Sequence, residues 1–390
     1  MAGSTPGLVI EPRGTMTLPR PDDWHLHLRD GAAMAAVVAQ LPRTMARAII
    51  MPNLRPPVRT VAEALAYRAR IAAALPPGSD FEPLMTLYLT DATSPDEVDR
   101  AVASGAVFGV KLYPAGATTN SDSGVTAIER VFPVLERMQA LDLPLLVHGE
   151  VTRAAVDVFE REAAFVEEVA RPLVARFPAL RVVMEHITTS EAVRFVEEAS
   201  DRVAATVTAQ HLMYNRNAIF EGGLRPHRYC LPVLKHEQDR QALLETVVRR
   251  GGAKFFLGTD SAPHARASKE SCCGAAGCFT QHAALELYAA VFEAEGALHN
   301  LRAFACENGP RFYGLRANAE RLPRSRVELR RETWTTPESF AFGDGAVVVP
   351  VGAGEPLSLR AYVVDAAAAA DGDGGEAAGA AAGAAAAAAK

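Results

Sequence analysis

Histidines and acids recur in this sequence directly after short apolar runs. His25 and His27 are separated by one residue, a spacing that places two imidazoles on the same face of a β-strand. Imidazole nitrogens and carboxylate oxygens suit zinc in a catalytic site, where one coordination position is left to water. The set predicts a metal site if the fold brings its members together. Its other members are Lys111, His148, His186 and Asp260.

Lysine is the exceptional member of this set. A protonated ammonium has no lone pair and would repel a dication. If burial lowers the pKa of Lys111, its neutral amine can react with carbon dioxide to form a carbamate. That anion has two oxygens and can bridge two metal ions. Lys111 therefore favours a centre that holds two metals.

Each of these residues also has an ordinary structural interpretation. A single histidine at the end of a strand is more often a hydrogen-bonded structural residue than a ligand. Lys111 could extend its ammonium to solvent, and Asp260 could cap a turn. The recurrence of six such residues at the ends of separate apolar runs favours the metal site over these readings.

The elements that must position these residues alternate between strands and helices. Leu143 to Val147 is continuously apolar, as parallel strands covered on both faces usually are. Helix starts are indicated by Ser94-Pro95-Asp96-Glu97 and by Thr189-Ser190-Glu191, and residues 235–250 form an amphipathic candidate. The predicted strands are 16–28, 47–53, 81–89, 107–113, 143–150, 181–187, 202–211 and 253–260.

This alternation predicts an α/β fold, most readily a (β/α)8 TIM barrel. All six candidate residues would then lie at the C-terminal mouth of the barrel, where such enzymes have their active sites. An open eight-stranded sheet is the alternative, because periodicity does not show closure. Residues 1–15 are predicted to be an N-terminal extension and 16–364 the barrel with a C-terminal elaboration. Residues 365–390, rich in alanine and glycine, are predicted to be a disordered tail.

The bulk composition is that of a soluble globular enzyme, with 49% hydrophobic and 22% charged residues. A net charge of -6 gives no support to a nucleic-acid or anionic-membrane partner. No apolar stretch approaches the ~20 residues of a membrane span, and residues 1–13 lack the features of a secretory signal. The sparse cysteines include Cys272, Cys273 and Cys278 in one loop, without the paired spacing of a zinc knuckle. We expect a reducing compartment, the cytoplasm.

Pro-Asp-Asp-Trp-His-Leu-His-Leu-Arg-Asp at residues 21–30 resembles the first-strand signature of the bacterial single-function dihydroorotases. The likeness runs in order from residue 16 to residue 315, which makes it more specific than any single motif. Its further motifs are Met51-Pro52-Asn53, Lys111-Leu112-Tyr113-Pro114, Val147-His148-Gly149-Glu150, Glu185-His186-Ile187-Thr188 and Gly-Thr-Asp-Ser-Ala-Pro-His at 258–264.

The resemblance implies a barrel of the metal-dependent amidohydrolase type. It implies reversible cyclisation of N-carbamoyl-L-aspartate to L-dihydroorotate, in de novo pyrimidine biosynthesis, by a homodimer. Two zinc ions would be bridged by carboxylated Lys111 and by a hydroxide, which acts as the nucleophile. Asp260 would be the general acid and base. The more buried zinc would be held by His25, His27, Lys111 and Asp260, and the second by Lys111, His148 and His186.

The resemblance also implies a set of substrate contacts. Arg29, Asn53 and His264 would hold the substrate carboxylate, and a planar guanidinium suits that task because it can donate two parallel hydrogen bonds. A mobile loop at 115–120 would close over the substrate through its paired threonines. The full predicted substrate-binding set is His27, Arg29, Asn53, Thr118, Thr119, His148, Leu231, His264 and Ala276, with Leu231 and Ala276 contributing backbone atoms.

Three other functions remain open at this point. A hydantoinase, dihydropyrimidinase or allantoinase would share the metal ligands, although these families usually lack the combination of Arg29, Asn53 and His264. A non-catalytic dihydroorotase-like partner of aspartate transcarbamoylase would be expected to have lost metal ligands. A sugar- or phosphate-binding barrel without metal would leave the lysine and four histidines unexplained.

Overall fold

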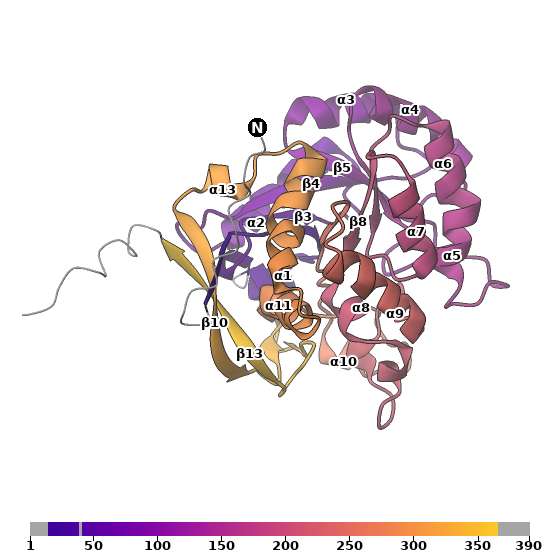
Figure 1. Cartoon of the computed structure of the whole chain (residues 1–390). Coiled ribbons are helices and arrows are strands. Elements are labelled where there is room, and N and C mark those ends of the chain that lie inside the picture. Colours follow the sequence, from indigo (N-terminus) through magenta and orange to yellow (C-terminus); the bar gives the residue numbers. More distant parts are fainter. Residues whose placement is uncertain (1–14, 39–40, 366–390) are drawn as a thin grey trace, which may run out of the picture.

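Eight parallel strands form the centre of the molecule, each hydrogen-bonded to the next strand in the chain (Figure 1). The computed structural model describes residues 15–38 and 41–365. Most of these strands are buried along their whole length, as is usual for parallel strands that are covered on both faces. The strands are β2 (Asp22–Leu26), β3 (Arg47–Ile50), β4 (Glu82–Tyr88), β5 (Val107–Leu112), β6 (Leu145–His148), β7 (Val182–Glu185), β8 (Val203–Val207) and β9 (Phe255–Leu257).

The sheet closes where the chain leaves β2 and β9. The backbone N–H of Asp260 donates to the carbonyl of His25 at 2.9 Å, and the N–H of His27 donates to the carbonyl of Ser261 at 3.1 Å. Leu26 and Ser261 form a parallel bridge between the same two segments. The first and last strands therefore meet, which confirms the predicted (β/α)8 barrel and excludes the open sheet.

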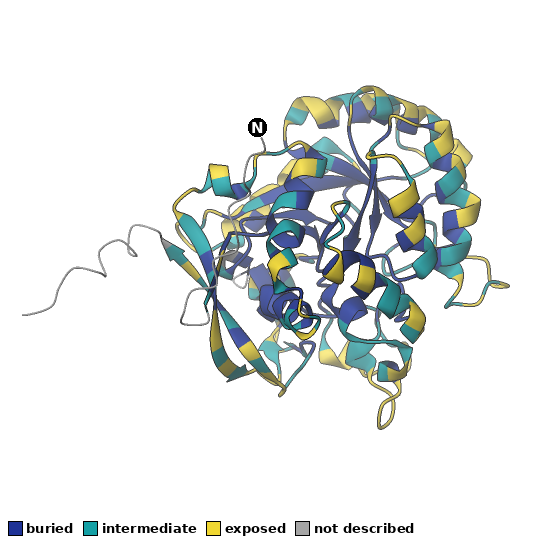
Figure 2. Ribbon diagram, viewed as in Figure 1, coloured by how far each residue is buried: buried dark blue, intermediate teal, exposed yellow. Residues whose placement is uncertain are grey.

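Helices surround the barrel, and their outer faces carry exposed residues in Figure 2, whereas the strands of the barrel are buried. Short 3-10 and π turns extend several of the helices. The helices are α1 (Gly31–Val38), α2 (Val61–Ala74), α3 (Pro95–Ser104), α4 (Phe132–Ala140), α5 (Arg161–Phe165), α6 (Arg171–Arg176), α7 (Ser190–Glu198), α8 (Ala209–Met213), α9 (Glu237–Leu243), α10 (Arg266–Lys269), α11 (Ala284–Ala294), α12 (Asn308–Tyr313) and α13 (Asn318–Arg321).

The helix starts largely follow the capping signals in the sequence. The Thr189 side chain accepts a hydrogen bond from the N–H of Ala192 and caps α7. Ser94 is the N-cap of α3 with Pro95 at the first helical position, but its hydroxyl makes no capping hydrogen bond. The amphipathic stretch at 235–250 contains α9 and a π turn that continues it to Arg249.

The prediction of one strand over 16–28 was wrong, because two strands of different sheets occupy this stretch. β1 (Met16–Pro19) pairs antiparallel with β10 (Ser325–Thr335), and β10 pairs with β13 (Pro356–Asp365) beside the barrel (Figure 1). Pro21 has no N–H to donate to a sheet and lies at the break between β1 and β2. All of β2 and most of β1 are buried, and the prediction of one continuous strand did not take account of Pro21. A short hairpin joins β10 to β13 and consists of β11 (Phe340–Ala341) and β12 (Val347–Val348).

The predicted terminal segments fall mostly outside the described residues. These are 1–14 of the expected extension and 366–390 of the expected tail. Asp365, which the sequence assigned to the tail, is the last residue of β13. Among the described residues, no helix has both the length and the apolar character that crossing a bilayer requires.

A buried ion pair joins the first two barrel strands at their N-terminal ends. Arg47 donates from Nε to Asp22 Oδ1 at 3.0 Å and from Nη2 to Asp22 Oδ2 at 2.5 Å. Asn318 of α13 donates to the same carboxylate at 2.7 Å. Both charged side chains are at most 4% exposed. Breaking such a pair leaves an uncompensated buried charge.

We therefore expect Arg47→Met to lower the free energy of unfolding by about 3 kcal/mol, because Asp22 would stay buried without its cation. The matched control is Arg194→Met, which removes an exposed arginine paired with Glu191 on α7. That change should alter stability by no more than about 0.5 kcal/mol. Urea denaturation of the two variants measures the difference. Equal stability losses would contradict a structural role for the Asp22–Arg47 pair.

Candidate active site

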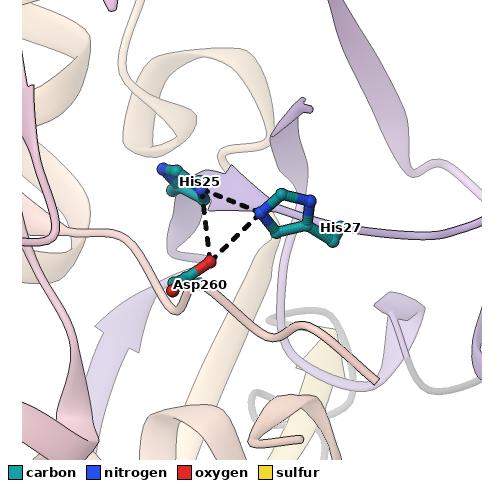
Figure 3. A group of neighbouring side chains, drawn as sticks. All are labelled: His25, His27 and Asp260. Carbon is teal, nitrogen blue, oxygen red and sulfur yellow. Dashed lines mark hydrogen bonds and ion pairs between the residues drawn. The ribbon is translucent and has the colours of Figure 1, made fainter. Parts of the chain in front are cut away.

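Three predicted metal ligands converge at the C-terminal mouth of the barrel (Figure 3). His25 Nε2 and His27 Nε2 lie 3.3 Å and 3.1 Å from Asp260 Oδ1, and the two imidazole nitrogens are 3.2 Å apart. All three side chains are buried. His25 lies on β2, His27 directly follows it, and Asp260 follows β9, so the closure of the barrel is what brings them together.

The donor set fits a metal ion. Ligands about 2.0–2.1 Å from a common tetrahedral ion lie roughly 3.3 Å from one another. The separations of 3.1–3.3 Å between the atoms of His25, His27 and Asp260 match this spacing. Two imidazole nitrogens and one carboxylate oxygen are also the donor types of catalytic zinc sites.

A second group of donors lies beside the first. The ring centroid of His186 is 4.9 Å from that of His25 and 4.8 Å from that of His148. His186 Nδ1 is buried and has no hydrogen-bond partner among the described residues. The cluster of His25, Glu185 and His186 also has the proximity of a metal-binding group. The structure thus brings both predicted halves of the centre into contact.

Glu185 is a buried member of the site that the sequence did not single out. Its carboxylate forms an ion pair with the Lys111 ammonium, and its Oε1 lies 3.1 Å from His25 Nδ1. Burial lowers the pKa of Lys111, and the charge of Glu185 opposes that shift. Lys111 lies near the end of β5, as the sequence predicted, and its roles as a metal ligand and as a carboxylated lysine remain predictions.

Glu150 holds His148 in one orientation. His148 Nε2 lies 2.7 Å from Glu150 Oε2, and both side chains are 1% exposed. Burial would raise the pKa of Glu150, but the hydrogen bond and charge of His148 bring it below its usual value. Because the ionised carboxylate can only accept, His148 Nε2 donates to it, and this contact fixes the orientation of the ring. Sequence reasoning missed this role, although Glu150 stands two residues after His148.

Carboxylates and histidines of the centre change each other's pKa values. Burial lowers the pKa of His25, but Glu185 and Asp260 outweigh this effect and raise it to about 9. Burial would raise the pKa of Asp260, yet hydrogen bonds from His25 and His27 hold it well below its usual value. Burial lowers the pKa of His27 to about 4. His25 thus lies between the carboxylates of Glu185 and Asp260, which also contact Lys111 and His27 respectively.

Three predicted functional residues have left-handed backbone conformations. Arg29, His186 and Asp260 have φ values of 64°, 44° and 45°. Such conformations are uncommon for residues with a Cβ and cluster at functional sites. Each follows the end of a barrel strand, where a sharp turn directs its side chain back over the mouth. The unusual backbone conformation of these three residues therefore coincides with side chains that belong to the candidate site.

A cavity opens at the candidate metal ligands. Two predicted residues are absent from its wall: Lys111 is buried beneath it, and His264 lies behind Arg29. The structure adds Tyr113, Ala262 and Gly277 to the predicted set. The lining residues are His25, His27, Arg29, Asn53, Tyr113, Thr118, Thr119, His148, His186, Leu231, Asp260, Ala262, Ala276 and Gly277.

One wall of the cavity holds an arginine beside a neutral histidine. Arg29 Nε donates to the carbonyl of Pro263 at 2.9 Å, and its Nη2 lies 2.9 Å from His264 Nε2. Burial and the charge of Arg29 lower the pKa of His264 to about 2. The pair therefore carries one positive charge, suited to an anionic group in the cavity.

Asn53 connects a metal-ligand candidate to the predicted loop. Its Oδ1 lies 2.9 Å from His27 Nδ1, and its Nδ2 donates to the carbonyl of Thr119 at 3.0 Å. The Asn120 side chain donates in turn to the carbonyl of Asn53 at 2.9 Å. The Thr119 hydroxyl donates to the carbonyl of Ala276 at 3.4 Å, across the cavity. The loop therefore lies over the cavity, with Asn53 orienting both His27 and the loop.

Comparisons with known proteins agree with this arrangement. Residues 5–322 match the amidohydrolase family. The chain is 64% identical to a dihydroorotase of Aromatoleum aromaticum over 346 residues, 89% of this chain and 99% of that protein. A crystal structure of a Campylobacter jejuni dihydroorotase is 34% identical, with a TM-score of 0.81, and covers 90% of this chain and 99% of its own. A Saccharomyces cerevisiae dihydroorotase in complex with 5-fluoroorotic acid is 30% identical, with a TM-score of 0.82, at the same coverages.

The fold, the donor clusters and the family match define an amidohydrolase, a class of metal-dependent enzyme. Within that class, the identity over nearly the whole length of its relatives shows that the chain belongs to the dihydroorotase family. It is accordingly an enzyme that hydrolyses a cyclic amide, which confirms the resemblance seen in the sequence.

The contact between Glu150 and His148 predicts an effect on metal binding. Glu150→Ala should weaken the affinity for a divalent metal by roughly 10–100-fold, because His148 would lose the acceptor that fixes its ring. Competition with a chromophoric chelator measures this affinity. The control is Glu221→Ala, which removes an exposed carboxylate that pairs with Arg228. Unchanged affinity in the Glu150 variant would show that His148 needs no such partner.

Proposed function

We propose that this enzyme interconverts N-carbamoyl-L-aspartate and L-dihydroorotate at a centre that holds two zinc ions. The observation that carries this proposal is the pairing of two donor clusters at the floor of one cavity with a single cationic arginine in its wall. The clusters suit metal ions, and Arg29 suits a carboxylate. Cyclic amide hydrolysis of an anionic substrate requires both features. The reaction belongs to de novo pyrimidine biosynthesis.

Under this proposal His25, His27 and Asp260 would hold the more buried zinc, and His148 and His186 would contribute to the second. Carboxylated Lys111 would be shared between them. When bound, the metals would polarise the amide carbonyl and lower the pKa of a water molecule that attacks it. Carboxylation would replace the ammonium that pairs with Glu185, leaving His25 as the partner of that carboxylate.

Asp260 would move the proton during the reaction. Its carboxylate stays ionised at neutral pH because His25 and His27 hold its pKa well below the usual value, against the effect of burial. It can therefore accept a proton as the nucleophile is formed and deliver it to the ring nitrogen that leaves. In the biosynthetic direction the same aspartate would work in reverse.

The remaining residues would bind and enclose the substrate. Arg29 would take the substrate carboxylate, with His264 beside it and Asn53 orienting the loop. Thr118 and Thr119 lie on that loop, whose closure would exclude water. The ring would contact His27, His148 and the backbone of Leu231 and Ala276. The yeast neighbour with 5-fluoroorotic acid, a pyrimidine carboxylate, supports a ligand of this chemistry. A homodimer in the cytoplasm remains a prediction from the resemblance.

A substrate panel tests the proposed function. The zinc-loaded enzyme should hydrolyse dihydroorotate at least about 100-fold more efficiently than hydantoin or allantoin, because only dihydroorotate carries the carboxylate that Arg29 would bind. Chelation should abolish turnover, and zinc should restore it. Comparable rates with hydantoin would favour the hydantoinase alternative, and full activity after metal removal would contradict the proposed centre.

Replacing the proposed proton carrier gives a second test. Asp260→Asn should lower kcat for dihydroorotate by roughly 10²–10⁴-fold, because an amide cannot accept and return the proton. Circular dichroism and zinc analysis of the same preparation establish whether the fold and the metal persist. Asp201→Asn, at an exposed position before β8, provides the control. A variant that keeps its metal and most of its turnover would remove Asp260 from this role.

A further inference from the structure

Lys269, at the end of α10, is buried and donates to three backbone carbonyls. Its Nζ lies 2.7 Å from each of the carbonyl oxygens of Tyr229, Ala275 and Gly277. The residue is only 3% exposed. An ammonium has three N–H donors, so these contacts satisfy all of its hydrogen-bonding capacity. Lys269 therefore joins two chain segments that are distant in sequence.

Both of these segments form walls of the active-site cavity. Leu231 follows Tyr229 by two residues and lines the cavity, as do Ala276 and Gly277. The N–H of Gly277 also donates to the carbonyl of Tyr229 at 3.0 Å. Gly277 has a φ of 147°, and a Cβ at this position would lie 2.5 Å from the carbonyl oxygen of Ala262. The segments thus pack backbone against backbone, with Lys269 at the junction.

The carbonyls of the 275–277 segment point in two directions. Those of Ala275 and Gly277 accept from Lys269, whereas the carbonyl of Ala276 is directed at groups of the active site. It lies 2.9 Å from His264 Nε2 and accepts from the Thr119 hydroxyl at 3.4 Å. By holding the two flanking carbonyls, Lys269 fixes the orientation of the peptide group between them.

The ammonium of Lys269 has no carboxylate partner among the described residues. Lys111 is also buried, but it forms an ion pair with Glu185. Burying an ammonium without a counter-ion is costly, and three carbonyl dipoles offset that cost in place of an acid. An apolar side chain could fill the same space without burying a charge, but it would leave these carbonyls without the lysine donor. The lysine differs from an apolar residue because its ammonium holds three carbonyl groups around one donor atom.

We propose that Lys269 is a positioning residue for substrate recognition, which aims the backbone of Ala276 and holds the Leu231 segment against it. This inference rests on the proposed function, since it concerns the binding of the same substrate ring. Lys269 touches neither the candidate metal ligands nor the reacting atoms. Its loss should therefore weaken substrate binding more than it slows the chemical step.

The test is Lys269→Met in the zinc-loaded enzyme, compared with the unaltered chain. The variant should raise KM for dihydroorotate about tenfold and change kcat by less than about threefold, because binding contacts are displaced while the reacting groups are kept. Its Kd for 5-fluoroorotic acid, measured by calorimetry, should rise by a similar factor. Its zinc content should equal that of the unaltered enzyme.

The chain offers a matched control in Lys254, which precedes β9 at the opposite end of the barrel. Its Nζ also donates to three carbonyls, those of Val196, Ala199 and Ser200, at 3.2, 2.5 and 3.3 Å. Lys254→Met removes the same number of hydrogen bonds far from the cavity, so it should lower thermal stability and leave KM and Kd unchanged. A purely structural lysine would behave in this way at both positions.

The outcomes for the two variants decide the proposal. A raised KM and Kd only in the Lys269 variant, with zinc retained, supports it. Unchanged KM and Kd in a folded Lys269 variant, or equal increases in both variants, overturns it. If Lys269→Met does not fold, Lys269→Gln keeps part of the donor capacity and must show an intermediate KM; a normal KM in that variant also overturns the proposal. Lack of dihydroorotate turnover in the unaltered enzyme would instead refute the proposed function.

Discussion

The active site depends on the closure of the barrel between its first and last strands. The N–H of Asp260 donates to the carbonyl of His25, and this backbone contact places the carboxylate of Asp260 beside the two imidazoles. Their donor atoms come from positions more than 230 residues apart in the chain. An open sheet with the same strands would leave these ligands at opposite edges. Closure is therefore the condition for a metal centre here.

Charge is separated between the floor and the wall of the cavity. Glu150, Glu185 and Asp260 surround the histidines at the floor, where their carboxylates contact His148, His25 and Lys111. The wall carries Arg29, and Lys269 lies behind the segment that completes it. Because His264 is neutral, the arginine keeps its charge available to an anion. The floor of the cavity is therefore suited to metal ions, and its wall is suited to a carboxylate.

Several residues of the site were accessible from sequence because their chemistry is unusual at strand ends. The recurrence of four histidines, a lysine and an aspartate at the ends of predicted strands was the basis for predicting a metal site. Glu150 and Glu185 were not identified, because a glutamate beside a histidine does not reveal which way its side chain points. Asn53 was expected to bind substrate, and the structure shows its amide engaged with His27 and the loop. The role of Lys269 was invisible, since its partners are backbone carbonyls.

The sequence by itself determined the class of fold, the order of the strands and the residues able to bind metal, because these follow from local hydrophobic periodicity and from side-chain chemistry. Only the tertiary structure decided that the barrel closes, that β1 leaves it for the sheet of β10 and β13, and that Glu185 pairs with Lys111. The physical reason is the same in each case. Contacts between distant segments depend on packing and side-chain direction, which no local pattern records. His25 was a candidate ligand in the sequence. It forms part of a site because the fold places Asp260 beside it.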